Sequence, residues 1–155
     1  MSERSEIASS VPNTRGHIVS GPSSPSPGGP YSQVVTVGHL VFSSGQRPEN
    51  PESGNIPVNF EHQAEQVFSN LEDGLSRAGC DLSDIVKVNV YLADLKYFEA
   101  FNQVYRRHIG KPYPARTTVG CQLRGILVEV DAIAVRKENR RAGANPAGAE
   151  VGRGY

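Results

Sequence analysis

The sequence predicts a single two-layer α+β domain with a mixed sheet, both helices on one face and the element order ββαβαββ. Three observations lead to this class. Apolar residues recur with a period of two in some segments and about 3.6 in others. Turns that contain Gly or Pro separate these segments. The chain of 155 residues is long enough for one domain with its own core.

The series begins with a β-hairpin. Residues 33–37 and 40–44 are short apolar runs, and Gly38-His39 between them is typical of a tight turn. A long loop from Gly45 to Pro57 follows, in which glycine and proline interrupt any regular element.

Two helices and three strands complete the series. The first helix spans about residues 60–78, with Asn59 as its N-cap and Gly79 as its C-terminal stop. Its apolar stripe consists of Phe60, Ala64, Val67, Phe68, Leu71, Leu75 and Ala78. The second helix spans about residues 95–108, with Asp94 as its cap and Phe98, Phe101, Val104 and Tyr105 facing inward. Strands are expected at 85–92, with Val86, Val88, Val90 and Leu92 on one face, and near 117–121 and 126–136.

The domain is expected to cover residues 30–137. Residues 1–29 are rich in Ser, Pro and Gly, and residues 138–155 lack any periodicity. Such segments bury too little apolar surface to order themselves, so both are predicted to be flexible tails.

Composition excludes several classes of function. Lys plus Arg equals Asp plus Glu at 16 each, which argues against nucleic-acid binding as the main activity. No apolar run approaches the length of a membrane span, and the first residues do not form a secretory signal, so we expect a cytoplasmic protein. The four histidines show no metal-ligand spacing, and no metal is predicted.

The last strand carries two carboxylates in an otherwise apolar segment. Glu129 and Asp131 share a face with large aliphatic side chains, and an unpartnered buried carboxylate is costly. Arg116, at the head of the preceding strand, is the candidate for a nearby positive charge. An arginine and a partly buried carboxylate together suit a small anionic substrate.

The sheet face away from the helices is also apolar. Val35, Tyr91, Leu127 and Ile133 are expected there, and an apolar sheet face of this kind usually marks an interface. We expect a homo-oligomer that packs sheet against sheet; the alternative is that a tail covers this face.

Seven segments of the chain, in order, resemble the RidA (YjgF) family of enamine and imine deaminases. They are residues 29–33, 42–46, 63–71, 84–88, 101–105, 114–119 (Pro-Ala-Arg-Thr-Thr-Val) and 128–134 (Val-Glu-Val-Asp-Ala-Ile-Ala). The resemblance implies a chorismate-mutase-like fold and a homotrimer with clefts between subunits. It also implies hydrolysis of 2-imino and 2-enamino acids such as 2-aminoacrylate to 2-keto acids and ammonia, without a cofactor.

The same resemblance assigns roles to individual residues. Arg116 would bind the substrate carboxylate, and Glu129 would activate water. The substrate-binding residues would be Tyr31, Ser44, Gly45, Asn102, Tyr105 and Thr118. The segment 120–126 is about two residues shorter than in the best-known deaminases and carries Arg124, which either favours a larger or dianionic substrate of the amino-muconate type or is a solvated charge.

Other interpretations stay open at this stage. Arg116 can instead neutralise Glu129 or Asp131 in a structural ion pair, and on chemistry alone either acid can be the base. The protein can also be a non-catalytic trimer that binds a metabolite or regulates a partner. An endoribonuclease, an activity attributed to some relatives, is the least favoured function, because the chain has neither a basic excess nor tryptophan.

Overall fold

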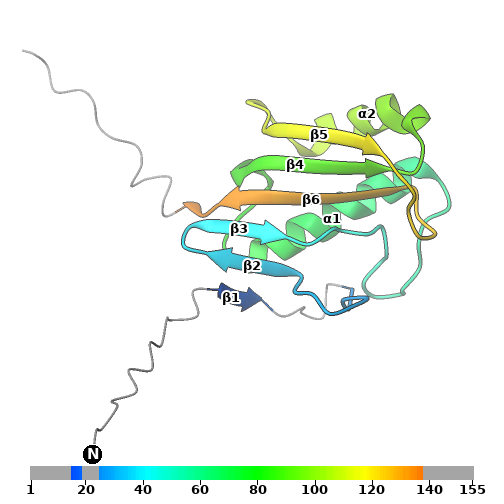
Figure 1. The fold of residues 1–155 in the computed structure, drawn as a ribbon. Coiled ribbons are helices and arrows are strands. Elements are labelled where there is room, and N and C mark those ends of the chain that lie inside the picture. Colours follow the sequence, from blue (N-terminus) through cyan, green and yellow to red (C-terminus); the bar gives the residue numbers. More distant parts are fainter. Residues whose placement is uncertain (1–14, 19–24, 138–155) are drawn as a thin grey trace, which may run out of the picture.

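The computed structural model describes residues 15–18 and 25–137, which form a mixed sheet with two helices on one face (Figure 1). The strands are β1 (Arg15–Ile18), β2 (Val34–Val37), β3 (Leu40–Ser43), β4 (Ile85–Leu92), β5 (Ala115–Gly120) and β6 (Val128–Val135). The helices are α1 (Phe60–Arg77) and α2 (Phe98–His108), with the 3-10 turns η1 (Leu82–Asp84) and η2 (Leu95–Tyr97). The strand order is β1-β2-β3-β6-β4-β5, and only β4 and β5 are parallel. The predicted α+β class is confirmed.

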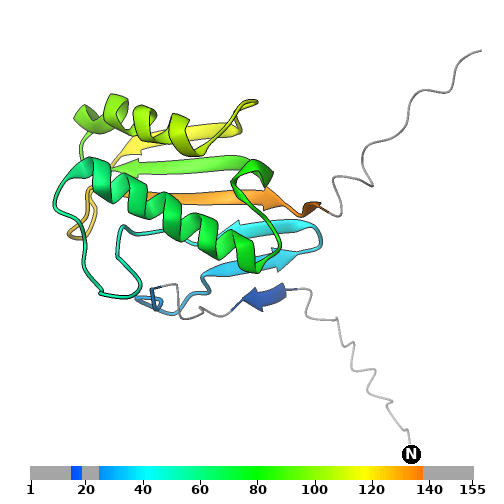
Figure 2. The same ribbon diagram turned by 180° about the vertical axis from the view of Figure 1, so that it is seen from behind.

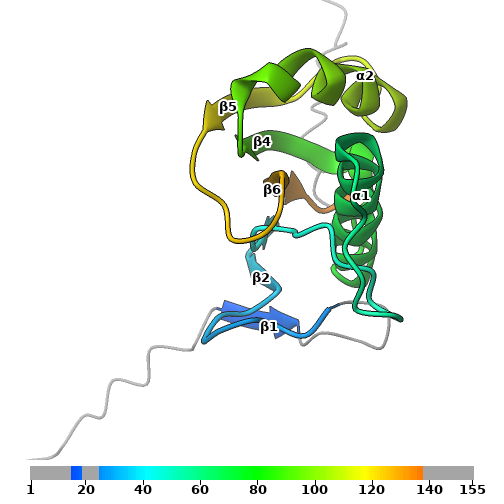
Figure 3. The same cartoon turned by 90° about the vertical axis from the view of Figure 1, so that its right-hand side faces the viewer.

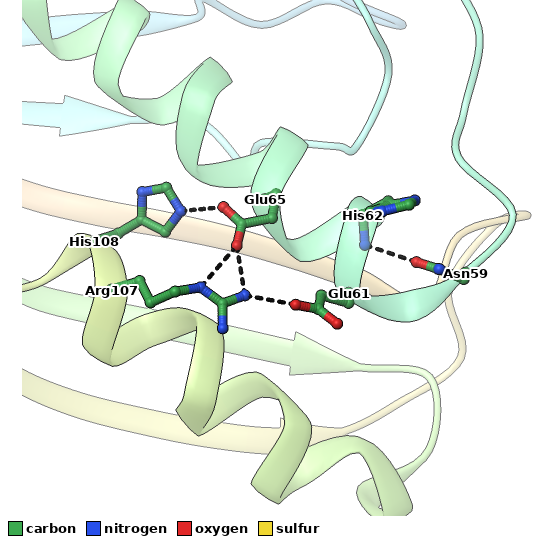
Figure 4. Close-up of polar contacts among 6 residues, drawn as sticks. All are labelled: Asn59, Glu61, His62, Glu65, Arg107 and His108. Atoms are coloured by element: carbon green, nitrogen blue, oxygen red, sulfur yellow. Dashed lines mark hydrogen bonds and ion pairs between the residues drawn. The ribbon is translucent and has the colours of Figure 1, made fainter.

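Helix α1 forms as its sequence predicts. The Asn59 side chain accepts a hydrogen bond from the backbone N–H of His62 at 2.8 Å (Figure 4). Gly79, just beyond the helix, takes the left-handed conformation with φ +77°, as a C-terminal stop requires. All seven predicted stripe residues are buried. They belong to the hydrophobic core, and Figure 2 shows helix α1 lying across the sheet.

Charged side chains join α1 to α2. Arg107 Nη2 lies 2.8 Å from Glu61 Oε1 and 2.6 Å from Glu65 Oε1, and His108 Nε2 contacts the second oxygen of Glu65 (Figure 4). The His108 ring also stacks on Phe68, with 4.8 Å between centroids. His108 is therefore half-buried. These contacts hold α2, which carries two of the predicted site residues, against α1.

Strands β4 and β6 bury alternate residues along most of their length. One parity faces the helices and forms the core: Val88, Val90 and Leu92 on β4, and Val128, Val130, Ala132 and Ala134 on β6. The other parity lies on what we call the open face, because both helices are on the opposite side of the sheet (Figure 3). The open face carries Lys87, Asn89 and Tyr91 on β4, and Glu129, Asp131, Ile133 and Val135 on β6.

Apolar side chains cover much of the open face, as predicted. Val35, Val37, Leu40, Phe42, Ile133 and Val135 are cross-strand neighbours on β2, β3 and β6. Leu40 is 39% exposed and Phe42 36% exposed, so water reaches side chains that normally pack against protein. Nothing in the described residues covers them.

Three side chains depart from the predicted pattern. A register shift between Ile85 and Lys87 turns Val86 outward, and Ile85 takes its place in the core. Phe98, the first residue of α2, is 42% exposed, although its ring centroid lies 5.7 Å from the Arg116 guanidinium carbon. Leu127 precedes β6 and packs against the core, so it does not lie on the open face.

Part of the predicted N-terminal tail belongs to the folded domain. β1 was not predicted, yet it pairs antiparallel with β2. Further along, Gln33 Nε2 donates to the carbonyl of Pro25 at 2.5 Å, and the Gly28 N–H donates to the Tyr31 hydroxyl at 3.0 Å. The rest of this tail, and the tail predicted at 138–155, lie outside the described residues. No helix in the described ranges has the length and apolar character needed to cross a bilayer.

Candidate active site

Arg116 lies on β5 and points toward the helix layer. Its Cα is in register with that of Val88, a core residue, so both side chains face α2. Arg116 Nη2 donates to Asn102 Oδ1 at 2.7 Å, and the guanidinium lies over the Tyr105 ring, 4.8 Å from its centroid. One hydrogen bond and contacts with the rings of Phe98, Phe101 and Tyr105 therefore orient the guanidinium without a carboxylate partner.

A pocket of about 240 Å³ opens beside this guanidinium. It is lined by Asn102, Tyr105, Arg106, Tyr113, Pro114 and Arg116. The Tyr105 hydroxyl is buried with no hydrogen-bond partner among the described residues, and so is the hydroxyl of Thr118, which faces the same side of β5. Burial raises the pKa of Tyr105, with the positive charge of Arg116 opposing the shift, so the hydroxyl stays a donor at neutral pH. Three predicted site residues thus lie on the same side of the sheet as Arg116. Asn102 and Tyr105 line the pocket, and Thr118 follows Arg116 on the same face of β5.

Glu129 lies on β6 and points to the open face. Its neighbour in the register is Tyr91, which faces the same way. Glu129 borders a second, larger pocket of about 600 Å³, which is lined by Gly28, Tyr31, Ser44, Gly45, Arg47, Glu49, Arg124 and Glu129. Three further predicted site residues, Tyr31, Ser44 and Gly45, are therefore grouped with Glu129.

The segment after β3 is held against β6 so that Glu129 packs directly on Gly45. The N–H of Gln46 donates to the carbonyl of Val130 at 2.7 Å, and its side-chain amide donates to the carbonyl of Ser44 at 3.0 Å. A Cβ added to Gly45 would lie 2.0 Å from Glu129 Oε1. Only glycine leaves room for the carboxylate in this position.

Glu129 has an environment suited to proton transfer. Burial raises the pKa of its carboxyl group, Arg47 opposes the shift, and the negative charge of Asp131 adds to it. No hydrogen bond from the described residues ties the carboxylate down, so it is available to a ligand or to water. Asp131, in contrast, accepts hydrogen bonds from Asn89 Nδ2 at 2.8 Å and from the Tyr91 hydroxyl at 2.9 Å. Those two bonds give Asp131 a structural role.

Arg116 and Glu129 do not meet within one chain. They lie on opposite faces of the sheet and border different pockets. Among the described residues, Arg116 forms no ion pair with Glu129 or Asp131, so the structural ion pair considered for Arg116 is absent. A single small substrate cannot contact both side chains in an isolated chain.

Sequence reasoning overlooked Arg47 at the larger pocket. Arg47 Nη2 donates to the backbone carbonyl of Arg124 at 3.2 Å, which joins the segment after Gly45 to the loop between β5 and β6. The loop thus borders the Glu129 pocket, and Arg124 lines it. The sequence did offer a signal for Arg47, because it is a charged residue only two positions after Gly45, which was already assigned to the site. The described residues contain no group of three His, Cys, Asp or Glu side chains placed to hold a metal ion.

Comparison with known proteins identifies the family. The family model described as Endoribonuclease L-PSP matches residues 21–136. A RutC family protein of Pyrococcus abyssi is 40% identical over 116 residues, covering 73% of this chain and 91% of that protein. The 2-iminobutanoate/2-iminopropanoate deaminase of Capra hircus is 38% identical over 122 residues, covering 77% and 89%.

Solved structures agree with this match. The crystal structure of RidA from an Antarctic Psychrobacter superimposes with a TM-score of 0.73 at 39% identity, covering 76% of this chain and 97% of that chain. The sequence match and the shared fold extend over the same domain. The chain belongs to the RidA/YjgF/RutC family, the family of the Endoribonuclease L-PSP model.

Proposed function

We propose that this protein is a homotrimeric deaminase that hydrolyses 2-imino and 2-enamino acids to 2-keto acids and ammonia. The active site would form between two chains, with Arg116 from one and Glu129 from its neighbour. The observation that carries this proposal is the placement of the two residues on opposite faces of one sheet, each bordering its own pocket. Membership of a family in which relatives are named as imine deaminases supports the reaction type.

The open face supplies a reason for the chains to associate. Its exposed aliphatic and aromatic side chains would leave water if another chain packed on them, at a gain of about 25 cal/mol for each Å² of apolar surface buried. Glu129 lies on this same face, beside the apolar residues of β6. Association would therefore bring a neighbouring chain close to the Glu129 pocket, where it can contribute Arg116.

In such a cleft each side chain has a defined task. The Arg116 guanidinium, oriented by Asn102, would bind the C1 carboxylate of the substrate through paired hydrogen bonds. An enamine first takes a proton from water on its terminal carbon and loses one from nitrogen, which gives the imine. Glu129 would then accept a proton from water while the water oxygen bonds to the imine carbon. Glu129 would then return its proton to nitrogen. The C–N bond breaks with its electron pair leaving on ammonia, while the hydroxyl group loses its proton and becomes the carbonyl.

The environment of Glu129 suits this cycle. A carboxylate must be ionised to accept a proton from water and protonated to return it to nitrogen. Burial raises the pKa of Glu129 above its ordinary value, which makes the carboxylate a stronger base toward water. Modest acceleration is sufficient, because 2-imino acids already hydrolyse in water and need mainly orientation and proton transfer.

The test is keto-acid formation from imines generated in situ. A pyridoxal-phosphate-dependent dehydratase acting on serine or threonine supplies the substrate, and semicarbazide competes as a trap. We expect wild type to accelerate release, and Arg116→Lys and Glu129→Gln to lower kcat/KM by about 100-fold. Asp131→Asn is the matched control, since it removes an acid from the same strand face but should keep most of the activity. Full activity in Glu129→Gln would overturn the proposed role.

A mixing experiment tests the origin of the two residues. Arg116→Ala and Glu129→Gln chains are each expected to be inactive alone. If a cleft takes one residue from each of two chains, random mixed trimers regain about one quarter of the wild-type activity. If both residues act within one chain, no mixture recovers activity. Sedimentation of the wild type provides the oligomeric state independently.

The remaining functions correspond to specific outcomes of these tests. A well-folded wild type that binds 2-keto acids but accelerates no imine hydrolysis would be a non-catalytic member of the family. Cleavage of RNA that is lost in Glu129→Gln would indicate a nuclease. The balance of 16 basic and 16 acidic residues does not favour the nuclease.

A further inference from the structure

The Glu129 pocket holds two arginines that the hydrolysis of a small imine does not require. Arg47 comes from the segment after β3, and Arg124 from the loop between β5 and β6. Neither guanidinium forms an ion pair with any described residue. This contrasts with the cations on the helix side of the molecule, where Arg77, Arg106 and Arg107 each pair with a carboxylate.

One contact between the two loops fixes the relative position of these arginines. Arg47 Nη2 donates to the backbone carbonyl of Arg124 at 3.2 Å. Because that acceptor belongs to the backbone, the Arg124 guanidinium stays free to face the pocket. Arg47 still has other N–H groups to donate, since one guanidinium carries five.

We infer that Arg47 and Arg124 bind a second acidic group of the substrate, so that the preferred substrates are dicarboxylic 2-imino acids. This inference rests on the proposed deaminase function, in which Arg116 of a neighbouring chain holds the first carboxylate. The two carboxylates would then lie on either side of the imine carbon, with Glu129 next to that carbon. Arginine is well matched to this task, because its planar fork binds a carboxylate through two parallel hydrogen bonds.

The dimensions of the pocket agree with a substrate that extends beyond the reacting carbon. About 600 Å³ lies within the range of ordinary ligand sites and leaves room for a side chain that ends in a carboxylate. A substrate with only a methyl side chain would leave the two guanidiniums solvated and unused.

The negative charges in the pocket do not cancel this attraction. Glu49 also lines it, but the Glu49 carboxylate is directed toward the turn at Gly54, where Oε1 lies 3.9 Å from the position of an added Cβ. Glu129 lines the pocket next to Gly45. Arg47 and Arg124 line the same pocket from two separate loops.

The first experiment measures binding of stable keto acids by calorimetry. Glutarate and 2-oxoglutarate serve as dicarboxylate probes and 2-oxobutanoate as the monocarboxylate. We expect Arg124→Gln to weaken 2-oxoglutarate binding about tenfold, the loss of one charge-assisted contact, and to leave 2-oxobutanoate unchanged. Arg77→Gln is the matched control, because it removes the same charge from α1 on the helix side. Equal affinities for the two keto acids in wild type would overturn the inference.

Hydrolysis of imines then separates this inference from the proposed function. An amino acid oxidase generates 2-iminoglutarate from glutamate and 2-iminobutanoate from 2-aminobutanoate. Preference for 2-iminoglutarate, lost in Arg124→Gln, supports the second carboxylate site. Hydrolysis of both imines at equal kcat/KM contradicts that site and leaves the deaminase function standing. Tight dicarboxylate binding without hydrolysis of either imine contradicts the deaminase function and leaves the second site standing.

Discussion

Replacement of Gly45 by alanine should displace the carboxylate of Glu129 without removing any chemical group from the site. The added Cβ would lie 2.0 Å from Oε1 and 2.9 Å from Cδ of Glu129, whereas ordinary contacts begin at about 3.4 Å. The carboxylate oxygen must therefore move by about 1.4 Å. A misplacement of about 1 Å costs on the order of 100-fold in rate, so we expect kcat/KM to fall about 100-fold in Gly45→Ala.

The fold should tolerate this change, since the atom that must move is the end of a flexible side chain. We expect the melting temperature of Gly45→Ala to stay within a few degrees of wild type. Gly110→Ala is the matched control, because a Cβ there meets no atom within 4 Å. The assay is keto-acid release from 2-iminobutanoate, with thermal unfolding measured on the same samples. Wild-type kcat/KM in Gly45→Ala would refute the argument that contact with Gly45 positions Glu129 for catalysis.

Three further predictions concern pH dependence and the orientation of Arg116. The Glu129 pKa is raised in the folded state, so ionised Glu129 destabilises the fold. The variant Glu129→Gln should therefore have a higher melting temperature than wild type at pH 8. This difference should vanish below the ordinary glutamate pKa of about 4.3, where Glu129 is protonated in both states. The Glu65 pKa is lowered: burial raises it, but Arg107 and His108 outweigh burial. Glu65→Gln should therefore lower the free energy of unfolding at pH 7 by about 1 kcal/mol or less, because the contacts of Glu65 with Arg107 and His108 are partly exposed. Unfolding curves measured at a series of pH values should show this loss disappearing as pH falls through the Glu65 pKa. Asn102→Ala removes the acceptor that orients Arg116; it should raise KM for 2-iminobutanoate about tenfold with a smaller change in kcat, and unchanged steady-state kinetics would contradict that role.

Sequence alone determined the features that depend on neighbours along the chain. The stripe of α1 and its cap at Asn59 follow from a local period of 3.6 and a side chain that bonds three residues ahead. The alternation along β6 placed Glu129 and Asp131 on one face for the same reason. The resemblance of short segments to a family then picked out Arg116 and Glu129, and the family itself is confirmed.

The tertiary structure decided which face each strand turns to the helices and which loops meet. Alternation along a strand shows that consecutive side chains point to opposite faces of the sheet. Only the pairing of β5 with β4, and of β4 with β6, shows that Arg116 and Glu129 lie on opposite faces. A register shift in β4 exposed Val86, which no local pattern reveals. The contact between Gly45 and Glu129 and the joining of Arg47 to Arg124 link residues 84 and 77 positions apart. Contacts at such separations depend on how the whole chain packs, so sequence periodicity does not determine them.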